Sequence, residues 1–269
     1  MINGIEFIGL PGSGKTTLLT QLVKTRESGD DWISGDESII KLGKILTNDS
    51  GKLKQALLKP LFWNSKTKLP VSRYLIKIKK GIIENTGSDH YDWSPLAQFC
   101  YQSNIHQRLK ECCPFTAIKY LNWMREAVLH TELLAGKIPS DTVLFDQHLF
   151  QIVRLFLDPD DTPDELTLVL KKIPIPAGII YVETDPKTII ERRKKRGSVK
   201  DRDWISKNNQ SEMEKLYRDV KIYQILLEAF EKANIPVYKF RDNDEDHINK
   251  VSRFINEIVN RKRTVKVNP

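Results

Sequence analysis

The chain has 269 residues, of which 40% are apolar, and this length is enough to bury a large core within one elaborated domain. It contains no run near the roughly 18 apolar residues that span a bilayer, and no basic segment precedes its first apolar stretch, so neither a membrane span nor a secretory signal is expected. Its 43 basic and 35 acidic side chains give a net charge of +8, which favours polyanionic partners such as nucleotides or nucleic acid. We therefore expect a cytoplasmic protein without membrane contact, as its three cysteines without metal-ligand spacing also indicate.

Apolar periodicity predicts short strands that alternate with helices. A strand at 5–9 leads into a helix at 15–26, and a second strand is expected at 31–34. The pattern then turns mostly helical before strand patterns return. Helices are expected at 51–59, 94–112 and 115–135, and the later strands at 142–146, 178–183 and 235–240. Five strands that alternate with helices favour an α/β fold with a parallel sheet covered on both faces.

This pattern predicts a single domain, 1–269, with one long interruption. Its core is expected to comprise residues 1–45 and 140–260, with a helical insert at about 46–139. The tail after Arg261 lacks periodicity and is expected to fray.

The stretch FIGLPGSGKTT, residues 7–17, joins the first strand to the first helix and fills the pattern G-x-x-x-x-G-K-[ST]. Glycines let such a loop turn its backbone N–H groups inward around phosphates. Lys15 is then expected to reach the β- and γ-phosphates, and the hydroxyl of Thr16 suits Mg²⁺. The sequence thus predicts a site for ATP and Mg²⁺, with contacts from Gly9, Pro11, Gly12, Ser13, Gly14, Lys15, Thr16 and Thr17.

Two acids follow predicted strands and are candidates for the other half of the site. Asp146 ends the apolar run of the third strand, where a carboxylate can hold Mg²⁺; the alternative is a cap for the segment that follows. Asp36 lies in the turn after the second strand, at the edge where ligands bind doubly wound sheets. It is a candidate for the base that accepts a proton from an acceptor hydroxyl, or for a helix cap.

A basic segment follows the fourth strand. Pro186 predicts the start of a helix, on which Arg192 and Arg196 lie one turn apart, and Arg202 follows in a polar loop. Guanidinium groups that close over a nucleotide can neutralise the transferred phosphoryl group and exclude water. A solvated basic helix end is the alternative interpretation.

These segments resemble the nucleoside monophosphate kinase superfamily of P-loop kinases, and thymidylate kinases most closely. The resemblance covers roughly residues 1–40 and 140–260, and its motifs are FIGLPGSGKTT, VLFD, YVETDPKTIIERRKKRG followed by DR, and LYRDVKIYQILLEAFEKANIPVYKF. It implies a P-loop kinase fold, a five-stranded parallel sheet in the order 2-3-1-4-5. It also implies that Arg192, Arg196 and Arg202 belong to a lid, at about 190–204, that closes on ATP.

The chain departs from thymidylate kinases near the acceptor. It has Asp146-Gln147 where they have Asp-Arg, and Gly35-Asp36-Glu37 where they have Arg-Glu-Pro, so two arginines expected near an acceptor phosphate are missing. The GDES turn is similar to the Gly-Asp turn of adenylylsulfate kinases and to the acid after strand two in several small-molecule and RNA kinases. Thymidylate is therefore disfavoured as the acceptor.

Three functional hypotheses remain from the sequence. The leading one is an ATP- and Mg²⁺-dependent phosphotransferase that moves the γ-phosphate to a small polar acceptor, namely a nucleotide, a nucleoside or another hydroxyl compound. The second is a kinase of RNA or DNA ends, which the positive charge favours. The third is a nucleotide-dependent switch or binding module without transfer activity. Because the loop itself carries no acid, the base is sought at Asp36.

Overall fold

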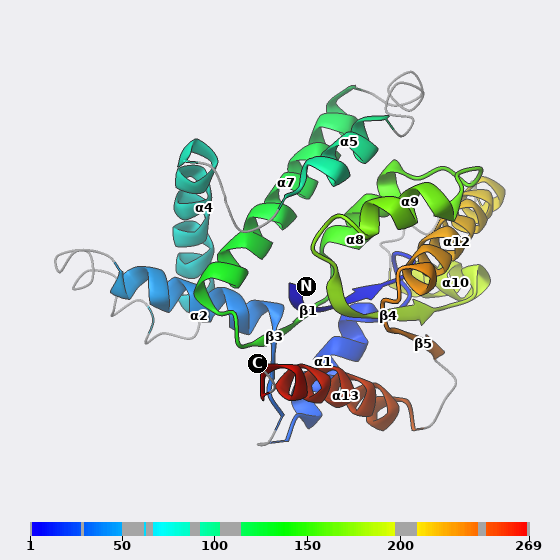
Figure 1. Cartoon of the computed structure of the whole chain (residues 1–269). Coiled ribbons are helices and arrows are strands. Elements are labelled where there is room, and N and C mark those ends of the chain that lie inside the picture. The colour runs from blue at the N-terminus through cyan, green and yellow to red at the C-terminus, as the bar shows by residue number, and fades with distance from the viewer. Residues whose placement is uncertain are drawn as a thin grey trace.

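The computed structural model describes residues 2–27, 30–49, 62, 67–86, 92–102, 114–196, 209–241 and 246–267. Their strands form one five-stranded sheet in the order β2-β3-β1-β4-β5, and all of its neighbouring strands pair in parallel. The strands are β1 (Ile2–Ile8), β2 (Trp32–Ser34), β3 (Thr142–Phe145), β4 (Pro176–Glu183) and β5 (Val237–Arg241). The predicted α/β class and strand order are confirmed (Figure 1).

Helices cover both faces of this sheet (Figure 1). Alternate side chains of β1 point to opposite faces, as expected of a strand: Ile5 and Phe7 join one apolar cluster and Ile8 another. Helices α1 (Lys15–Thr25) and α13 (His247–Val267) complete the first cluster. The second cluster contains α8 (Leu149–Val153), η2 (Arg154–Phe156), α9 (Pro163–Leu170), α10 (Pro186–Arg196) and α12 (Asn209–Lys232).

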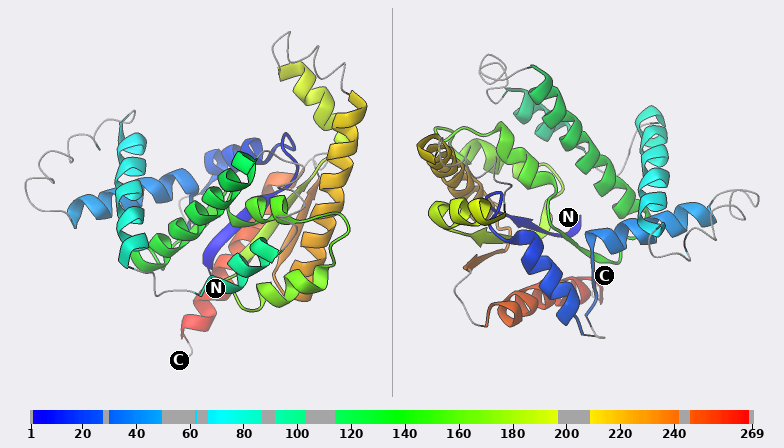
Figure 2. Two further views of the ribbon diagram at one scale, coloured as in Figure 1. Left: turned by 90° about the horizontal axis from the view of Figure 1, so that it is seen from above. Right: turned by 180° about the vertical axis from the view of Figure 1, so that it is seen from behind.

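Between β2 and β3, the regular secondary structure of the described residues is helical. The helices are α2 (Gly35–Asn48), α4 (Lys68–Thr86), α5 (Ser94–Gln102) and α7 (Pro114–Lys137). Apolar side chains of α2, α4 and α7, among them Leu42, Ile76 and Leu133, pack against β3. The expected helix at 115–135 corresponds to α7, whereas the one at 51–59 and the end of the one at 94–112 lie outside the described residues. Figures 1 and 2 show α2 and α4 near the β2–β3 end of the strand order and α12 near the β4–β5 end.

Two further expectations concern the second half of the chain. Helix α10 begins at Pro186 as predicted, where the backbone N–H of Lys187 donates to the Asp185 carboxylate at 3.0 Å. The expected fraying after Arg261 is wrong, since α13 continues to Val267. Val251, Ile255 and Ile258 bury one face of α13 in the core, and this anchor lets the helix extend into its polar end. None of the described helices is long and apolar enough to cross a bilayer.

Candidate functional site

The connection between β1 and α1, together with the first two residues of α1, is here called the glycine loop (residues 9–16). Three of its positions have backbone angles that favour glycine. The φ angles of Gly9, Gly12 and Gly14 are 146°, 93° and 103°, in the region that L side chains rarely adopt. A Cβ atom on Gly9 would lie 2.6 Å from the carbonyl oxygen of Val182 on β4. Gly14 is the N-cap of α1 and supplies no side-chain cap, so the positive end of that helix is left for an anion.

Lys15 folds back over the loop. Its ammonium group donates to the carbonyl oxygens of Gly9 and Leu10, both at 2.9 Å, and lies 3.4 Å from Oγ of Ser13. Lys15 as a whole residue is only 4% exposed. Burial lowers the pKa of Lys15 to about 8; attraction to Asp146 raises it, and repulsion from Arg154 lowers it further. Two of its three donors are thus fixed by backbone, and the charge is held where a phosphate group can neutralise it.

The loop meets the acid that follows β3. Oγ1 of Thr16 donates to Oδ2 of Asp146 at 2.6 Å, across 130 residues of sequence. The predicted proximity of the two is confirmed, and the alternative of a helix cap is wrong, because His148 is the N-cap of α8. Oδ1 of Asp146 is buried, and no donor from the described residues reaches it. A buried carboxylate oxygen beside a threonine hydroxyl fits a hard cation such as Mg²⁺, which takes oxygen ligands.

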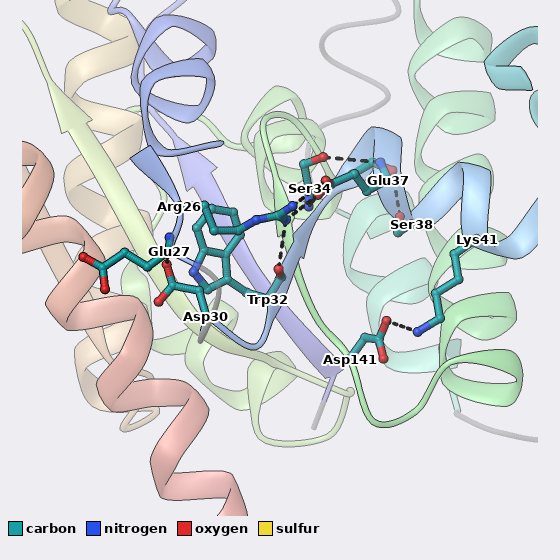
Figure 3. A network of polar contacts seen from close by, with 10 residues as sticks. Arg26, Glu27, Asp30, Trp32, Ser34, Glu37, Ser38, Lys41 and Asp141 are labelled. Atoms are coloured by element: carbon teal, nitrogen blue, oxygen red, sulfur yellow. Dashed lines mark hydrogen bonds and ion pairs between the residues drawn. The ribbon is translucent and has the colours of Figure 1, made fainter. Parts of the chain in front are cut away.

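The turn after β2 is built by a capping box (Figure 3). Ser34 is the N-cap of α2: its hydroxyl accepts from the backbone N–H of Glu37 at 3.3 Å, and the Glu37 carboxylate accepts from the backbone N–H of Ser34 at 2.8 Å. Arg26 at the end of α1 donates to both oxygens of Glu37 at 2.8 Å, and its guanidinium lies 5.2 Å from the ring centre of Trp32. The alternative of Asp36 as the cap is therefore wrong, because Ser34 and Glu37 take that role.

Asp36 takes no part in the helix cap. It lies at the same edge of the sheet as Asp146. Ser34 is opposite Leu144 in the parallel pairing of β2 and β3, so each acid lies two residues beyond this paired position. The Asp36 side chain is 62% exposed and forms an ion pair of 3.1 Å with Arg73 of α4. Sequence reasoning missed Arg73, because it lies in a basic stretch that shows no functional spacing.

Helix α10, which follows β4 in the chain, contacts the glycine loop through two arginines. Arg192, a predicted site residue, donates to the carbonyl oxygen of Ser13 at 3.4 Å. Arg193 makes the closer contact, 3.0 Å to the carbonyl oxygen of Pro11, and also pairs with Glu212 of α12 at 3.2 Å. The one-turn spacing that selected Arg192 and Arg196 passed over Arg193. Of the other predicted lid residues, Arg196 ends α10 with its side chain outside the described set, and Arg202 lies outside the described residues.

The remaining predicted loop residues differ in exposure. Pro11 and Thr17 are exposed, whereas Ser13 is buried at 1% exposure, and its carbonyl oxygen also accepts from Thr184 at 3.1 Å. Gly12 packs against Ile189 of α10, where an added Cβ would lie 3.3 Å from the Ile189 side chain. These contacts hold the loop against the ends of β4 and α10.

A buried acid below the loop was also missed. Glu6 of β1 is 2% exposed, and its carboxylate accepts from the backbone N–H groups of His148, Phe150 and Gln151 at 2.8 to 3.2 Å. Burial raises the pKa of Glu6 to about 7, although these three hydrogen bonds lower it. The signal for this role was an acid within an otherwise apolar strand. Its effect is to fix the start of α8 next to the glycine loop.

No protein-family model matches the chain, and no curated protein sequence matches it significantly.

Proposed function

We propose that this protein is an ATP- and Mg²⁺-dependent phosphotransferase that moves the γ-phosphate to the hydroxyl group of a small polar acceptor. The observation that carries the proposal is the 2.6 Å contact between Thr16 and Asp146, next to a buried Asp146 oxygen that no described donor reaches. A glycine loop alone only holds phosphates. Its junction with a strand-end acid adds a place for the metal that phosphoryl transfer needs.

Each donor-side residue has a role that follows from its contacts. Lys15 and backbone N–H groups of the glycine loop bind the β- and γ-phosphates. Thr16 and Asp146 hold Mg²⁺, which when bound withdraws charge from the phosphate oxygens. Arg192 and Arg193 flank the loop through Ser13 and Pro11, where they can neutralise charge on the transferred group. Arg196 and Arg202 stay predictions for the same role.

Asp36 is proposed as the base on the acceptor side. The acceptor oxygen attacks the γ-phosphorus, the bond from that phosphorus to the β–γ bridging oxygen breaks, and ADP leaves with the bridging oxygen. The proton of the hydroxyl group passes to the Asp36 carboxylate. Two features support this assignment: Asp36 makes no cap, and Asp36 and Asp146 each lie two residues beyond the paired residues Ser34 and Leu144. Arg73 supplies a positive charge beside it for an anionic acceptor.

The proposal is tested by incubating the protein with Mg-ATP and panels of nucleosides, nucleotides and other hydroxyl compounds, and measuring phosphorylated product. We expect Asp36→Asn to lower kcat by about 100-fold or more with little change in nucleotide affinity. Asp49→Asn is the matched control, because Asp49 at the end of α2 is also an exposed acid with a basic partner, Lys137 at 2.7 Å. The absence of product across all panels, with Lys15→Ala equal to wild type in ATP turnover, would refute the proposal.

A second candidate acceptor is the end of a polynucleotide. The net charge of +8 favours it, as does Trp123 of α7, which is 44% exposed with the Lys119 ammonium 4.5 Å from its ring centre. This version predicts phosphorylated oligonucleotide ends and oligonucleotide binding that weakens steeply with salt. A flat salt response supports the small acceptor. A switch without transfer would bind ATP and show no product in any panel.

A further inference from the structure

Two buried side chains that have no role in the proposed donor site form hydrogen bonds with the backbone N–H and carbonyl groups of Gly9. The Gly9 N–H donates to Oε1 of Gln151 on α8 at 3.3 Å, and Nε2 of Gln151 donates to the Gly9 carbonyl oxygen at 3.1 Å. The hydroxyl of Tyr223 on α12 lies 2.6 Å from the same carbonyl oxygen and 2.9 Å from Oε1 of Gln151. Gln151 is 7% exposed and Tyr223 is 0% exposed, so these contacts are shielded from water.

The same carbonyl oxygen also accepts from Lys15, at 2.9 Å. The position of the Gly9 carbonyl therefore sets the position of the Lys15 ammonium. We propose that Gln151 and Tyr223 are positioning residues, which fix the Gly9 peptide and through it hold Lys15 in the orientation that binds phosphate. The link from Tyr223 to Lys15 stands on these contacts alone, whereas its consequence for nucleotide affinity rests on the proposed function.

Packing alone does not explain these two polar residues. Both lie in or beside an apolar cluster, where Phe and Leu would fill similar space without burying polar atoms, and unpartnered polar atoms are costly there. Their supports are also specific. The backbone N–H of Gln151 is held by Glu6 at 2.8 Å, and the Arg154 guanidinium lies 5.7 Å from the ring centre of Tyr223 while pairing with Asp219 of the same helix. The pair of Gln151 and Tyr223, here called the clamp, is thus held by contacts with β1, η2 and α12.

The first test is nucleotide affinity. Tyr223→Phe removes one hydroxyl and keeps the ring, and we expect the Kd for Mg-ATP to rise about fivefold, the effect of one hydrogen bond. Gln151→Glu keeps the acceptor for the Gly9 N–H but places a carboxylate oxygen against the Gly9 carbonyl, so a rise of tenfold or more is expected. Tyr217→Phe is the matched control, because this tyrosine of α12 is 48% exposed. Wild-type affinity in Tyr223→Phe would overturn the proposal.

A double-mutant cycle shows whether Tyr223 acts through Lys15. In a Lys15→Ala background, Tyr223→Phe is expected to leave nucleotide affinity unchanged, because the group that it positions is gone. A fivefold loss that persists in that background would mean that Tyr223 supports the loop by another route, and would overturn the positioning role.

The second readout needs no nucleotide. Hydrogen exchange of the Gly9 backbone amide, followed by NMR in the free protein, is expected to be about fivefold faster in Tyr223→Phe, because the amide donates to Oε1 of Gln151 and Tyr223 contacts that same oxygen. An unchanged exchange rate at Gly9 in a folded Tyr223→Phe protein would overturn the clamp. Faster exchange at Gly9 in a protein that binds no ATP would instead refute the proposed function and leave the clamp standing.

Discussion

The glycine loop and the turn after β2 both follow strands whose carboxyl ends share one edge of the sheet, yet they present charge in opposite ways. In the loop, Lys15 is 4% exposed and Ser13 is 1% exposed. Side chains of α8, α10 and α12 donate hydrogen bonds to the loop backbone, and Asp146 after β3 accepts one from Thr16. In the turn, the Asp36 side chain is 62% exposed and has a surface arginine as its partner. The loop encloses its charge, and the turn offers its charge to solvent.

This difference separates the two halves of the proposed reaction. A phosphate site works best when its donors are fixed before the ligand arrives, and the loop has that property. In the turn, Arg26, Ser34 and Glu37 fix the start of α2, but Asp36, the proposed base, is exposed. Such an arrangement suits an acceptor that enters from solvent and completes the site on binding.

The largest expected effect is at the enclosed charge. Lys15→Ala removes a cation held by the carbonyls of Gly9 and Leu10, and we expect phosphoryl transfer to fall by about 1,000-fold. Lys24→Ala is the control, since Lys24 is an exposed lysine of the same helix, and it should retain wild-type turnover. Initial rates with Mg-ATP and the identified acceptor measure both. Similar rates for the two variants would contradict the proposal that the buried Lys15 binds the phosphates of ATP.

The next effect compares one glycine from each region. Gly9→Ala forces a side chain onto a φ of 146° and within 2.6 Å of the Val182 carbonyl oxygen, so the free energy of unfolding should fall by about 3 kcal/mol. Gly35→Ala, at the start of α2, adds a Cβ that would meet its nearest neighbour at 3.5 Å, an ordinary contact. It should change stability by less than about 0.5 kcal/mol. Chemical denaturation measures the free energy of unfolding of both variants. Equal losses of stability would show that the backbone of Gly9 is no more constrained than that of Gly35.

A third prediction uses pH to compare two glutamates. Burial raises the pKa of Glu6 to about 7, above its ordinary 4.5, so the stability that Glu6 contributes is fully present below pH 4.5 and is lost as the pH rises through 7. Burial also raises the pKa of Glu37, but the hydrogen bonds from Arg26 and Ser34 outweigh it and the net shift is downward. Glu37 therefore contributes stability above pH 4.5 that is lost on acidification.

The measurement is the free energy of unfolding between pH 5 and pH 8 for wild type and Glu6→Gln. The shift of Glu6 corresponds to about 3 kcal/mol, so wild type should lose stability relative to the variant by roughly that amount as the pH rises. All other titrating groups are common to the two proteins and cancel in the difference. Parallel pH profiles would show that Glu6 is not buried as a charge below the loop.

Most of the glycine-loop site could be predicted from the sequence, because its residues follow a motif with fixed local spacing. The motif identifies Gly9, Gly14, Lys15 and Thr16. Asp146 is identified by its position after an apolar strand. In the structure, Thr16 and Asp146 form a hydrogen bond. The strand order came from the family resemblance and not from the residue pattern. It is confirmed by the parallel pairings of the sheet.

The partners of these residues could not be predicted, because they come from distant parts of the chain. Gln151 and Tyr223 meet Gly9 across 142 and 214 residues, and nothing in their local sequence marks that contact. The capping box of Ser34 and Glu37 was readable from the S-x-x-E spacing, but Asp36 between them was considered for the cap instead. Arg73 was hidden within a run of basic residues, where charge alone does not select one side chain.

The smallest expected effect is at the open half. The pair of Arg73 and Asp36 is largely exposed on both sides, and such pairs add little to stability, so Arg73→Ala should change the free energy of unfolding by less than about 0.5 kcal/mol. Its effect should instead fall on the acceptor: we expect the KM for an anionic acceptor to rise about threefold while kcat and the KM for ATP stay near wild type. Lys41→Ala, which breaks the pair of Lys41 with Asp141, is the control from the same helix as Asp36. A rise in the KM for ATP would place Arg73 in the donor half, and would mean that the open turn and the enclosed loop form one site rather than two.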